Sequence, residues 1–261
     1  MADNIFEIKD LSFSYGNNKV IDGLNLKIKE GKITTLIGAN GCGKSTLFNL
    51  MTKNIKPDNG KIFLGGQNIE QMKLKDFARK TAIVHQYNTA PPDITVKKLV
   101  EFGRTPYHTL GLSPNPEEDR EKVRFALEIT NTKKFEDKPV SQLSGGQKQR
   151  VWIAMALAQD TKILFLDEPT TYLDIRYQLQ ILRLVKRLNS EFNITVIMVL
   201  HDINQSLCYS DEIVAMQNGK VLSQGAPKEI ITPKLIKDVY GVTLETGAVS
   251  YTHLRAHETL R

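Results

Sequence analysis

The sequence contains no apolar run long enough to cross a membrane as a helix. The longest, Ile194–Leu200, has the length of a single β-strand. The first residues also lack the basic start and the apolar stretch of a secretory signal. From these absences we expect a chain that stays inside the cell. If it works at a membrane, we expect it there as a peripheral subunit on the cytoplasmic face.

Cysteine and blocks of like charge are also scarce. The two cysteines, Cys42 and Cys208, are far apart and form no ligand-spaced cluster, so we expect neither a disulfide framework nor a zinc site. The net charge is +6, but the 35 basic residues are interspersed with 29 acidic ones. We therefore expect no nucleic-acid partner. The 41% hydrophobic and 25% charged content is ordinary for a globular protein.

The residue pattern predicts an α/β fold with two kinds of sheet. Alternating apolar and polar residues at 5–9 and 20–28, with Gly16-Asn17-Asn18 between them, predict an antiparallel hairpin near the N-terminus. Apolar runs then alternate with helical periodicity, which favours a mainly parallel sheet. The strands are expected at Ile33–Ile37, Lys61–Leu64, Ala82–Val84, Lys162–Leu166 and Ile194–Leu200, and the helices at Lys44–Lys53 and Ile175–Asn189.

The middle of the chain, at about residues 88–160, has a different character. Several prolines separate three segments of helical periodicity, at Val96–Phe102, Glu117–Ile129 and Gly145–Gln159. We interpret this stretch as an α-helical subdomain inserted into the α/β core.

A glycine-rich loop lies between the strand expected at Ile33–Ile37 and the helix expected at Lys44–Lys53. Residues 38–45 match G-x-x-x-x-G-K-[ST] in the strand–loop–helix context that this pattern requires, which predicts a P-loop NTPase core. Lys44 is expected to reach the β- and γ-phosphates, Ser45 to bind Mg²⁺, and Thr46 to lie near the α-phosphate. The residues assigned to the nucleotide here are Gly38, Asn40, Gly41, Cys42, Gly43, Lys44, Ser45 and Thr46.

Two carboxylates end the strand expected at Lys162–Leu166. Asp167 at the strand tip is expected to hold Mg²⁺, and Glu168 to act as general base on the attacking water. The alternative is a pair of solvated acids. His201 follows the next strand, and ligands gather at the carboxyl ends of parallel strands, so we favour a catalytic imidazole over a structural helix cap.

Leu143–Gln147 reads Leu-Ser-Gly-Gly-Gln and is the most specific pattern in the chain. Ser144 is expected to cap a helix that begins near Gly145, and the glycines to expose backbone N–H groups to an anion. The alternative is an ordinary capped helix start. We prefer the anion site because a cap alone does not require two consecutive glycines followed by Gln147.

In this order, the glycine-rich loop, Leu143–Gln147, Asp167–Glu168 and His201 resemble the nucleotide-binding subunits of ABC transporters. The resemblance extends from about Ile5 to Val242. It implies an ATPase in which ATP is held between the phosphate loop of one subunit and Ser144, Gly145, Gly146 and Gln147 of another. Since this chain has one of each, it implies an ATP-dependent homodimer.

Three further positions take a role only from this resemblance. Tyr15 would stack on adenine, although a strand aromatic packed in the core is an alternative. Gln86 would contact Mg²⁺ or water during catalysis and sense a membrane partner. Asp174 would lie at the dimer seam. A groove between Gln86 and the helix at Val96–Phe102 would receive a helix of that partner.

Finer similarity points to a transport group. The segments Val96–Tyr107, Asp167–Gln178, Asp211–Met216 and Val239–Val242 resemble the group that imports iron(III)–siderophores, haem and cobalamin. This implies permease subunits in the membrane and, indirectly, an external solute-binding protein. Iron–siderophore import is preferred, with cobalamin or haem import next. A soluble ABC ATPase outside transport and a nucleotide sensor without hydrolysis remain alternatives from other functional classes.

Residues 249–261 show no periodicity or turn pattern. Val249–Thr259 resembles the translation of a transposon-end sequencing adapter, so we expect one ABC ATPase domain over 1–248 followed by a non-native tail. A native disordered tail is the alternative. Resequencing the locus with a different library chemistry tests this expectation, because recovery of the same codons would overturn it.

Overall fold

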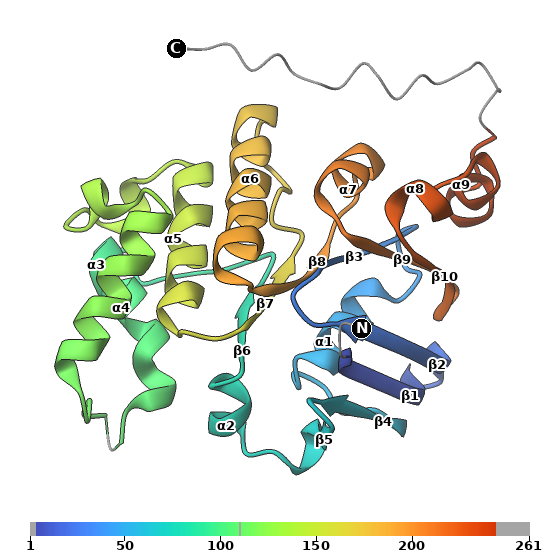
Figure 1. Ribbon diagram of the computed structural model, residues 1–261, viewed down its shortest axis with the longest axis horizontal. Coiled ribbons are helices and arrows are strands. Elements are labelled where there is room, and N and C mark those ends of the chain that lie inside the picture. The colour runs from blue at the N-terminus through green and yellow to red at the C-terminus, as the bar shows by residue number, and fades with distance from the viewer. Residues whose placement is uncertain (1–3, 110, 244–261) are drawn as a thin grey trace.

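The computed structural model describes residues 4–109 and 111–243. In Figure 1 the larger sheet runs from β6, near the centre, to β10 at the right, the smaller sheet lies at the lower right, and helices cover the larger one. The proposed end of the native chain, near Ala248, lies outside the described residues.

The smaller sheet is antiparallel and has the order β2–β1–β4–β5. Strands β1 and β2 form the hairpin expected from Gly16-Asn17-Asn18, with Tyr15 paired to Asn18 across the turn. Gly16 adopts the positive φ of 59° that a tight hairpin turn requires. The strands are β1 (Asn4–Tyr15), β2 (Asn18–Lys29), β4 (Asn59–Leu64) and β5 (Gln67–Asn68).

The larger sheet has the order β10–β9–β3–β8–β7–β6, and all its pairs are parallel except β10–β9. The mainly parallel sheet expected from the sequence is therefore confirmed. Its strands are β3 (Ile33–Gly38), β6 (Thr81–Val84), β7 (Ile163–Asp167), β8 (Thr195–Val199), β9 (Glu212–Gln217) and β10 (Lys220–Gly225).

Helices follow most of these strands. Helix α6 ends where Asn193 takes a left-handed φ of 52°, a conformation that asparagine tolerates well. It runs three residues beyond the end expected from the sequence. The helices outside the middle segment are α1 (Lys44–Met51), α2 (Leu74–Ala78), α6 (Ile175–Phe192), α7 (Ile203–Tyr209), α8 (Pro227–Ile230) and α9 (Pro233–Tyr240).

The helices of the middle segment lie together at the left of Figure 1, away from the antiparallel sheet. They are α3 (Val96–Glu101), α4 (Pro116–Ile129) and α5 (Gly145–Ala158), with the 3₁₀ helices η2 (Phe102–Tyr107), η3 (Lys133–Phe135) and η4 (Val140–Gln142). Helix α4 begins with proline at its first position, three acidic residues in its first turn and the Asn115 side chain as cap. The helical subdomain expected here is present.

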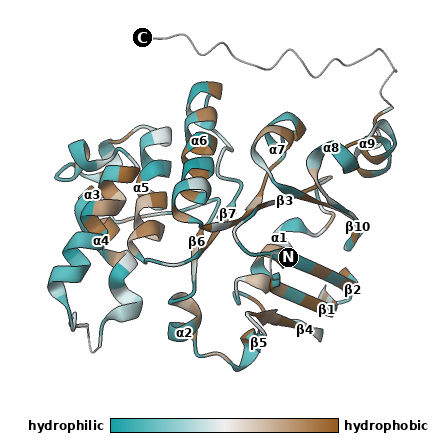
Figure 2. Cartoon of the chain, in the orientation of Figure 1, coloured by the Kyte–Doolittle hydropathy of each residue, from teal (hydrophilic) through white to brown (hydrophobic). Residues whose placement is uncertain are grey.

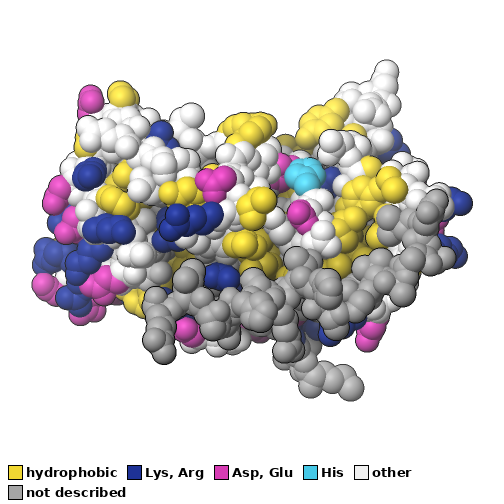
Figure 3. Space-filling model, turned by 90° about the horizontal axis from the view of Figure 1, so that it is seen from above, with side chains coloured by type: hydrophobic (Ala, Val, Ile, Leu, Met, Phe, Trp, Pro, Cys, Tyr) yellow, Lys and Arg dark blue, Asp and Glu magenta, His cyan; other side chains and the backbone are white. Residues whose placement is uncertain are grey.

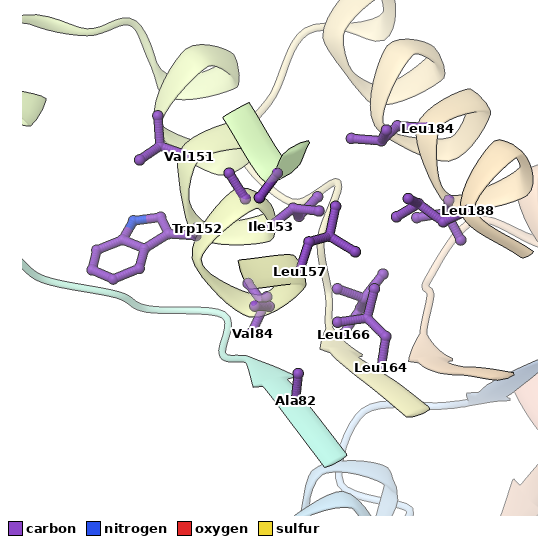
Figure 4. Close-up of a cluster of buried hydrophobic side chains, with 14 of the residues drawn as sticks. Ala82, Val84, Val151, Trp152, Ile153, Leu157, Leu164, Leu166, Leu184 and Leu188 are labelled. Atoms are coloured by element: carbon purple, nitrogen blue, oxygen red, sulfur yellow. The ribbon is translucent and has the colours of Figure 1, made fainter. Parts of the chain in front are cut away.

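The core is continuous between this helical segment and the sheet. Figure 4 shows Val151, Trp152, Ile153 and Leu157 of α5 beside Ala82 and Val84 of β6, with side chains of β7 and α6 beyond them. Figure 2 shows the same pattern as brown strands beneath helices with teal outer faces. The helix that carries Leu143–Gln147 at its start is thus packed directly on the sheet.

Within residues 4–109 and 111–243, no helix combines the length and the apolar character needed to span a bilayer.

Candidate nucleotide-binding and catalytic site

The site residues lie at the carboxyl edge of the larger sheet because of the strand register. Leu36 of β3 pairs with Val199 of β8, and Val199 pairs with Asp167 of β7. The phosphate loop, Glu168 and His201 therefore leave three adjacent strands at nearly the same level. Ligands of open parallel sheets bind at this edge.

The phosphate loop closes tightly on its own backbone. A Cβ on Gly38 would lie 2.6 Å from the Met216 carbonyl oxygen and 2.5 Å from the Cys42 Sγ, so only glycine fits there. Lys44 is 5% exposed and donates hydrogen bonds to the carbonyl oxygens of Gly38, at 2.9 Å, and Ala39, at 3.0 Å. Its ammonium group therefore lies inside the loop.

The remaining loop residues differ in exposure. Asn40, Gly41 and Ser45 are exposed, whereas Gly43 and Thr46 are buried. Cys42 is 7% exposed and its side chain packs beneath the loop. A direct nucleotide contact from its thiol does not follow from this packing. Its N–H donates to the Ala39 carbonyl oxygen at 3.3 Å and its carbonyl oxygen accepts from the Gly219 N–H at 3.0 Å, so the nucleotide contact expected of Cys42 stays a prediction.

Asp167 is the most perturbed acid of the site. Burial and the neighbouring charge of Glu168 raise its pKa to about 6, although His201 and Lys44 act in the opposite direction. Its Oδ1 atom is buried and has no hydrogen-bond partner among the described residues. A buried carboxylate oxygen without a donor is suited to a cation, which is what the sequence predicted for this position.

Glu168 receives two hydrogen bonds and a close contact from an imidazole. Gln86 donates to Oε2 at 2.6 Å, Thr171 donates to the same oxygen at 3.1 Å, and the His201 imidazole lies 2.6 Å from Oε1. Glu168 itself has a φ of 49°, which is uncommon for a residue other than glycine and costs backbone energy. The expected catalytic residues Gln86, Glu168 and His201 are therefore in direct contact.

His201 does not cap the helix that follows it. That role belongs to Asp202, whose side chain accepts a hydrogen bond from the Gln205 N–H at the start of α7. The structural alternative considered for His201 from the sequence is therefore wrong. Its side chain is 45% exposed and is directed at Glu168.

The Leu143–Gln147 segment forms a complete capping box at the start of α5. The Gln147 N–H donates to the Ser144 side chain, and the Ser144 N–H donates to the Gln147 side chain at 2.9 Å. Gly146 is buried, and a Cβ there would lie 2.4 Å from the Tyr177 ring. A capped, tightly packed helix start therefore does account for Gly146 and Gln147, contrary to the argument made from the sequence.

Ser144 and Gly145 nevertheless remain exposed at this helix start. Among the described residues, no hydrogen bond or ion pair joins them to the phosphate loop of the same chain. The Asp174 side chain caps α6 by accepting a hydrogen bond from the N–H of Tyr177, the residue whose ring packs against Gly146. The structure thus groups the expected residues into two sets within one chain.

Tyr15 is 53% exposed at the end of β1 and makes an edge contact with Phe13, with ring centroids 4.8 Å apart. The alternative of a core-packed aromatic is therefore wrong, and its face is open to a flat ligand.

Thr171 is a contact of Glu168 that was not predicted from the sequence. Its position three residues after Glu168, within a turn, was the only available signal.

A phosphate loop after β3 and an acid pair at the end of β7, at the same edge of one parallel sheet, define the P-loop class of NTPases. The family model described as "ABC transporter" matches this chain over residues 21–171. The iron(3+)-hydroxamate import ATP-binding protein FhuC of Bacillus subtilis (strain 168) is 44% identical over 242 residues, which cover 93% of this chain and 90% of that protein. The petrobactin import ATP-binding protein FpuD of Bacillus anthracis is 48% identical over 234 residues, which cover 90% of this chain and 85% of that protein.

A solved dimeric bacterial ABC transporter cassette superposes with a TM-score of 0.74 and 29% identity, covering 85% of this chain and 98% of that one. The chain belongs to the ABC transporter family, among its ATP-binding subunits.

Proposed function

We propose that this protein is the ATP-hydrolysing subunit of a membrane importer and that its cargo is an iron(III)–siderophore complex. The observation that carries the ATPase part is the contact of Glu168 with Gln86 and His201, at the sheet edge that also carries the phosphate loop. A base with ordered partners beside a phosphate cradle is what hydrolysis of ATP to ADP and phosphate requires.

The residues present fit Mg²⁺ as well as ATP. The buried, unpartnered Asp167 Oδ1 supplies a carboxylate ligand, the exposed Ser45 a hydroxyl, and Gln86 an amide oxygen. The ion, when bound, neutralises charge that develops on the phosphates. Lys44 and the loop N–H groups hold the phosphates, Glu168 takes the proton of the attacking water, and His201 orients Glu168 and that water.

The two residue sets require a second copy of the chain. Among the described residues, Ser144, Gly145 and Asp174 make no hydrogen bond to the phosphate loop of the same chain. In the family, ATP is held between the phosphate loop of one subunit and the segment equivalent to Ser144–Gln147 of the other. Tyr172 is 80% exposed and Ile175 is 74% exposed beside Asp174, which leaves an apolar surface for a partner. The likeness to a dimeric cassette supports a head-to-tail homodimer with two ATP sites.

The membrane partner is expected to dock on the helical segment. Lys and Arg, dark blue in Figure 3, gather with acidic residues at the end of the molecule that carries α3, α4 and α5. A cavity of about 630 Å³ lies between α3 and α4, with Phe102 in its wall at 49% exposure, but Gln86 does not line it, so the groove expected between Gln86 and α3 is a separate surface. We place the permease contact between Gln86 and α3, with the subunit bound at the cytoplasmic face of the membrane. An external solute-binding protein would act through the permease.

The cargo is inferred from the relatives, because this chain binds no solute in the proposed scheme. The two relatives are named for import of an iron(3+)-hydroxamate and of petrobactin. Import of cobalamin or haem is the second candidate.

The test is uptake of radioactive iron–siderophore by iron-starved cells that lack this gene and carry a plasmid copy. The wild type should restore uptake, Glu168→Gln should not, and Glu30→Gln, which changes an exposed acid beyond β2, should behave as wild type. Normal uptake in the deletion strain, with no second ATPase present, would exclude the iron cargo. Restoration by Glu168→Gln would exclude the proposed base.

A further inference from the structure

The back of the phosphate loop rests on the turn between β9 and β10. The Gly219 N–H in this turn donates a hydrogen bond to the Cys42 carbonyl oxygen at 3.0 Å. Gly219 and Cys42 are far apart in sequence and belong to segments that the proposed chemistry does not otherwise connect. This bond adds to the pairing of β3 with β9, in which Gly38 lies opposite Met216, and joins the turn after β9 to the far end of the phosphate loop.

This bond fixes the direction of one peptide group in the loop. In a planar trans peptide the carbonyl oxygen and the following N–H point to opposite sides. Since the Cys42 oxygen points outward to Gly219, the N–H of Gly43 must point to the other side, into the loop. Gly43 is also the residue immediately before α1, where N–H groups bind anions.

Gly219 itself has almost no freedom to move. A Cβ there would lie 2.2 Å from the Val20 carbonyl oxygen and 3.2 Å from the Ile21 Cα. The Asp22 N–H donates to the Gly219 carbonyl at 3.3 Å, which ties the turn to β2. Asn218 and Gly219 both have positive φ, 47° and 74°, as a tight two-residue hairpin turn requires.

We propose that Gly219 is a positioning residue for ATP, which holds the Cys42–Gly43 peptide so that the Gly43 N–H faces the phosphates. The proposal rests on the nucleotide site proposed above. It assigns to the β9–β10 turn a role in nucleotide affinity, although no side chain of that turn contacts the nucleotide.

The test compares Gly219→Ala with Gly66→Ala. Gly66 lies in the β4–β5 turn at a nearly equal φ of 80°, but a Cβ there meets no atom within 4 Å. Both variants carry the same backbone strain, and only Gly219→Ala must push its N–H away from Cys42. Loss of one charge-assisted hydrogen bond should weaken MgATP binding about tenfold in Gly219→Ala, with wild-type binding in Gly66→Ala.

Inorganic pyrophosphate, used to displace a fluorescent ATP analogue, should lose affinity by the same factor, because it occupies the phosphate cradle and not the base site. Equal affinities of the two variants for MgATP would overturn the proposal. If the wild type itself failed to bind MgATP, the nucleotide site would fail and not the role of Gly219.

Hydrogen exchange of the wild type covers the case in which Gly219→Ala does not fold. The Gly219 amide should be protected like the amides inside β9, since its bond to Cys42 is made without nucleotide. Exchange at the rate of an unbonded turn amide would refute the proposal without any variant.

Discussion

The packing of Gly146 against Tyr177 predicts a specific loss of stability in Gly146→Ala. The added methyl group would lie 2.4 Å from Tyr177 Cδ1 and 2.9 Å from Tyr177 Cβ, so the start of α5 must move away from α6. Overpacking of this kind costs about 1–3 kcal/mol. For a chain of this length, that corresponds to a fall in melting temperature of about 2–12 °C.

Gly145→Ala is the matched control, because a Cβ at Gly145 meets only Leu173 Cδ2, at an ordinary 3.4 Å. Both changes add the same methyl group within the first turn of α5. The higher helix propensity of alanine should leave Gly145→Ala neutral or stabilised by up to about 1 kcal/mol. Thermal and urea unfolding of the two proteins would give the difference directly.

A double-mutant cycle with Tyr177→Ala tests the cause. Once the ring is removed, only the 2.9 Å approach to the Cβ atom of residue 177 remains, so Gly146→Ala should cost less than it does beside Tyr177 and the two changes should couple by about 1 kcal/mol or more. If Gly146→Ala were as stable as the wild type, or if its cost were undiminished after the removal of the Tyr177 ring, the steric explanation of this glycine would be refuted.

Two other predictions concern the phosphate loop and the helical segment. Lys44→Ala should abolish detectable MgATP binding, measured by fluorescence titration, while its circular dichroism stays that of the wild type; unchanged affinity would contradict the role of Lys44. Burial alone would raise the pKa of Asp119, but hydrogen bonds from Ser113, Arg104 and His108 lower it below its usual 3.8. The ionised Asp119 therefore stabilises the fold above that pH, and this stabilisation is lost as the pH falls below it. Between pH 5 and about pH 3, the free energy of unfolding in urea should fall less for Asp119→Asn than for the wild type.

The sequence was sufficient for the features that depend on local pattern. The phosphate loop needs its glycines and Lys44 in a fixed order between a strand and a helix, and the structure has this arrangement. Parallel pairing also follows from alternating strands and helices. The ends of the strands expected in the larger sheet were predicted within one or two residues, because Gly31, Gly38 and Asp167 mark some of them in the sequence, whereas β1 extends six residues beyond the alternation at 5–9.

The sequence was insufficient where function depends on packing between distant segments. Only glycine fits at position 146 because the side chain of Tyr177, in the next α-helix, occupies the space where a Cβ atom would lie. No local pattern in the sequence reveals this contact. The bond from Gly219 to Cys42 spans most of the chain. Helices α2, α7, α8 and α9 and strands β5, β9 and β10 were not assigned from the sequence, because they are short. Apolar residues of α7, α8 and α9 also face a small separate cluster.

The hydrogen bonds on Glu168 lead to a prediction about turnover. A carboxylate offers about four acceptor sites, of which hydrogen bonds from Gln86 and Thr171 use two, and the His201 imidazole lies 2.6 Å from Oε1, so only about one or two are left for the attacking water. Thr171→Val removes one donor and should lower kcat about 2–10-fold with little change in KM, because the base is then less firmly oriented. Thr171→Ser keeps the hydroxyl and should restore kcat. Equal kcat values for the valine and serine variants would mean that Thr171 acts through its packing and not through its bond to Glu168.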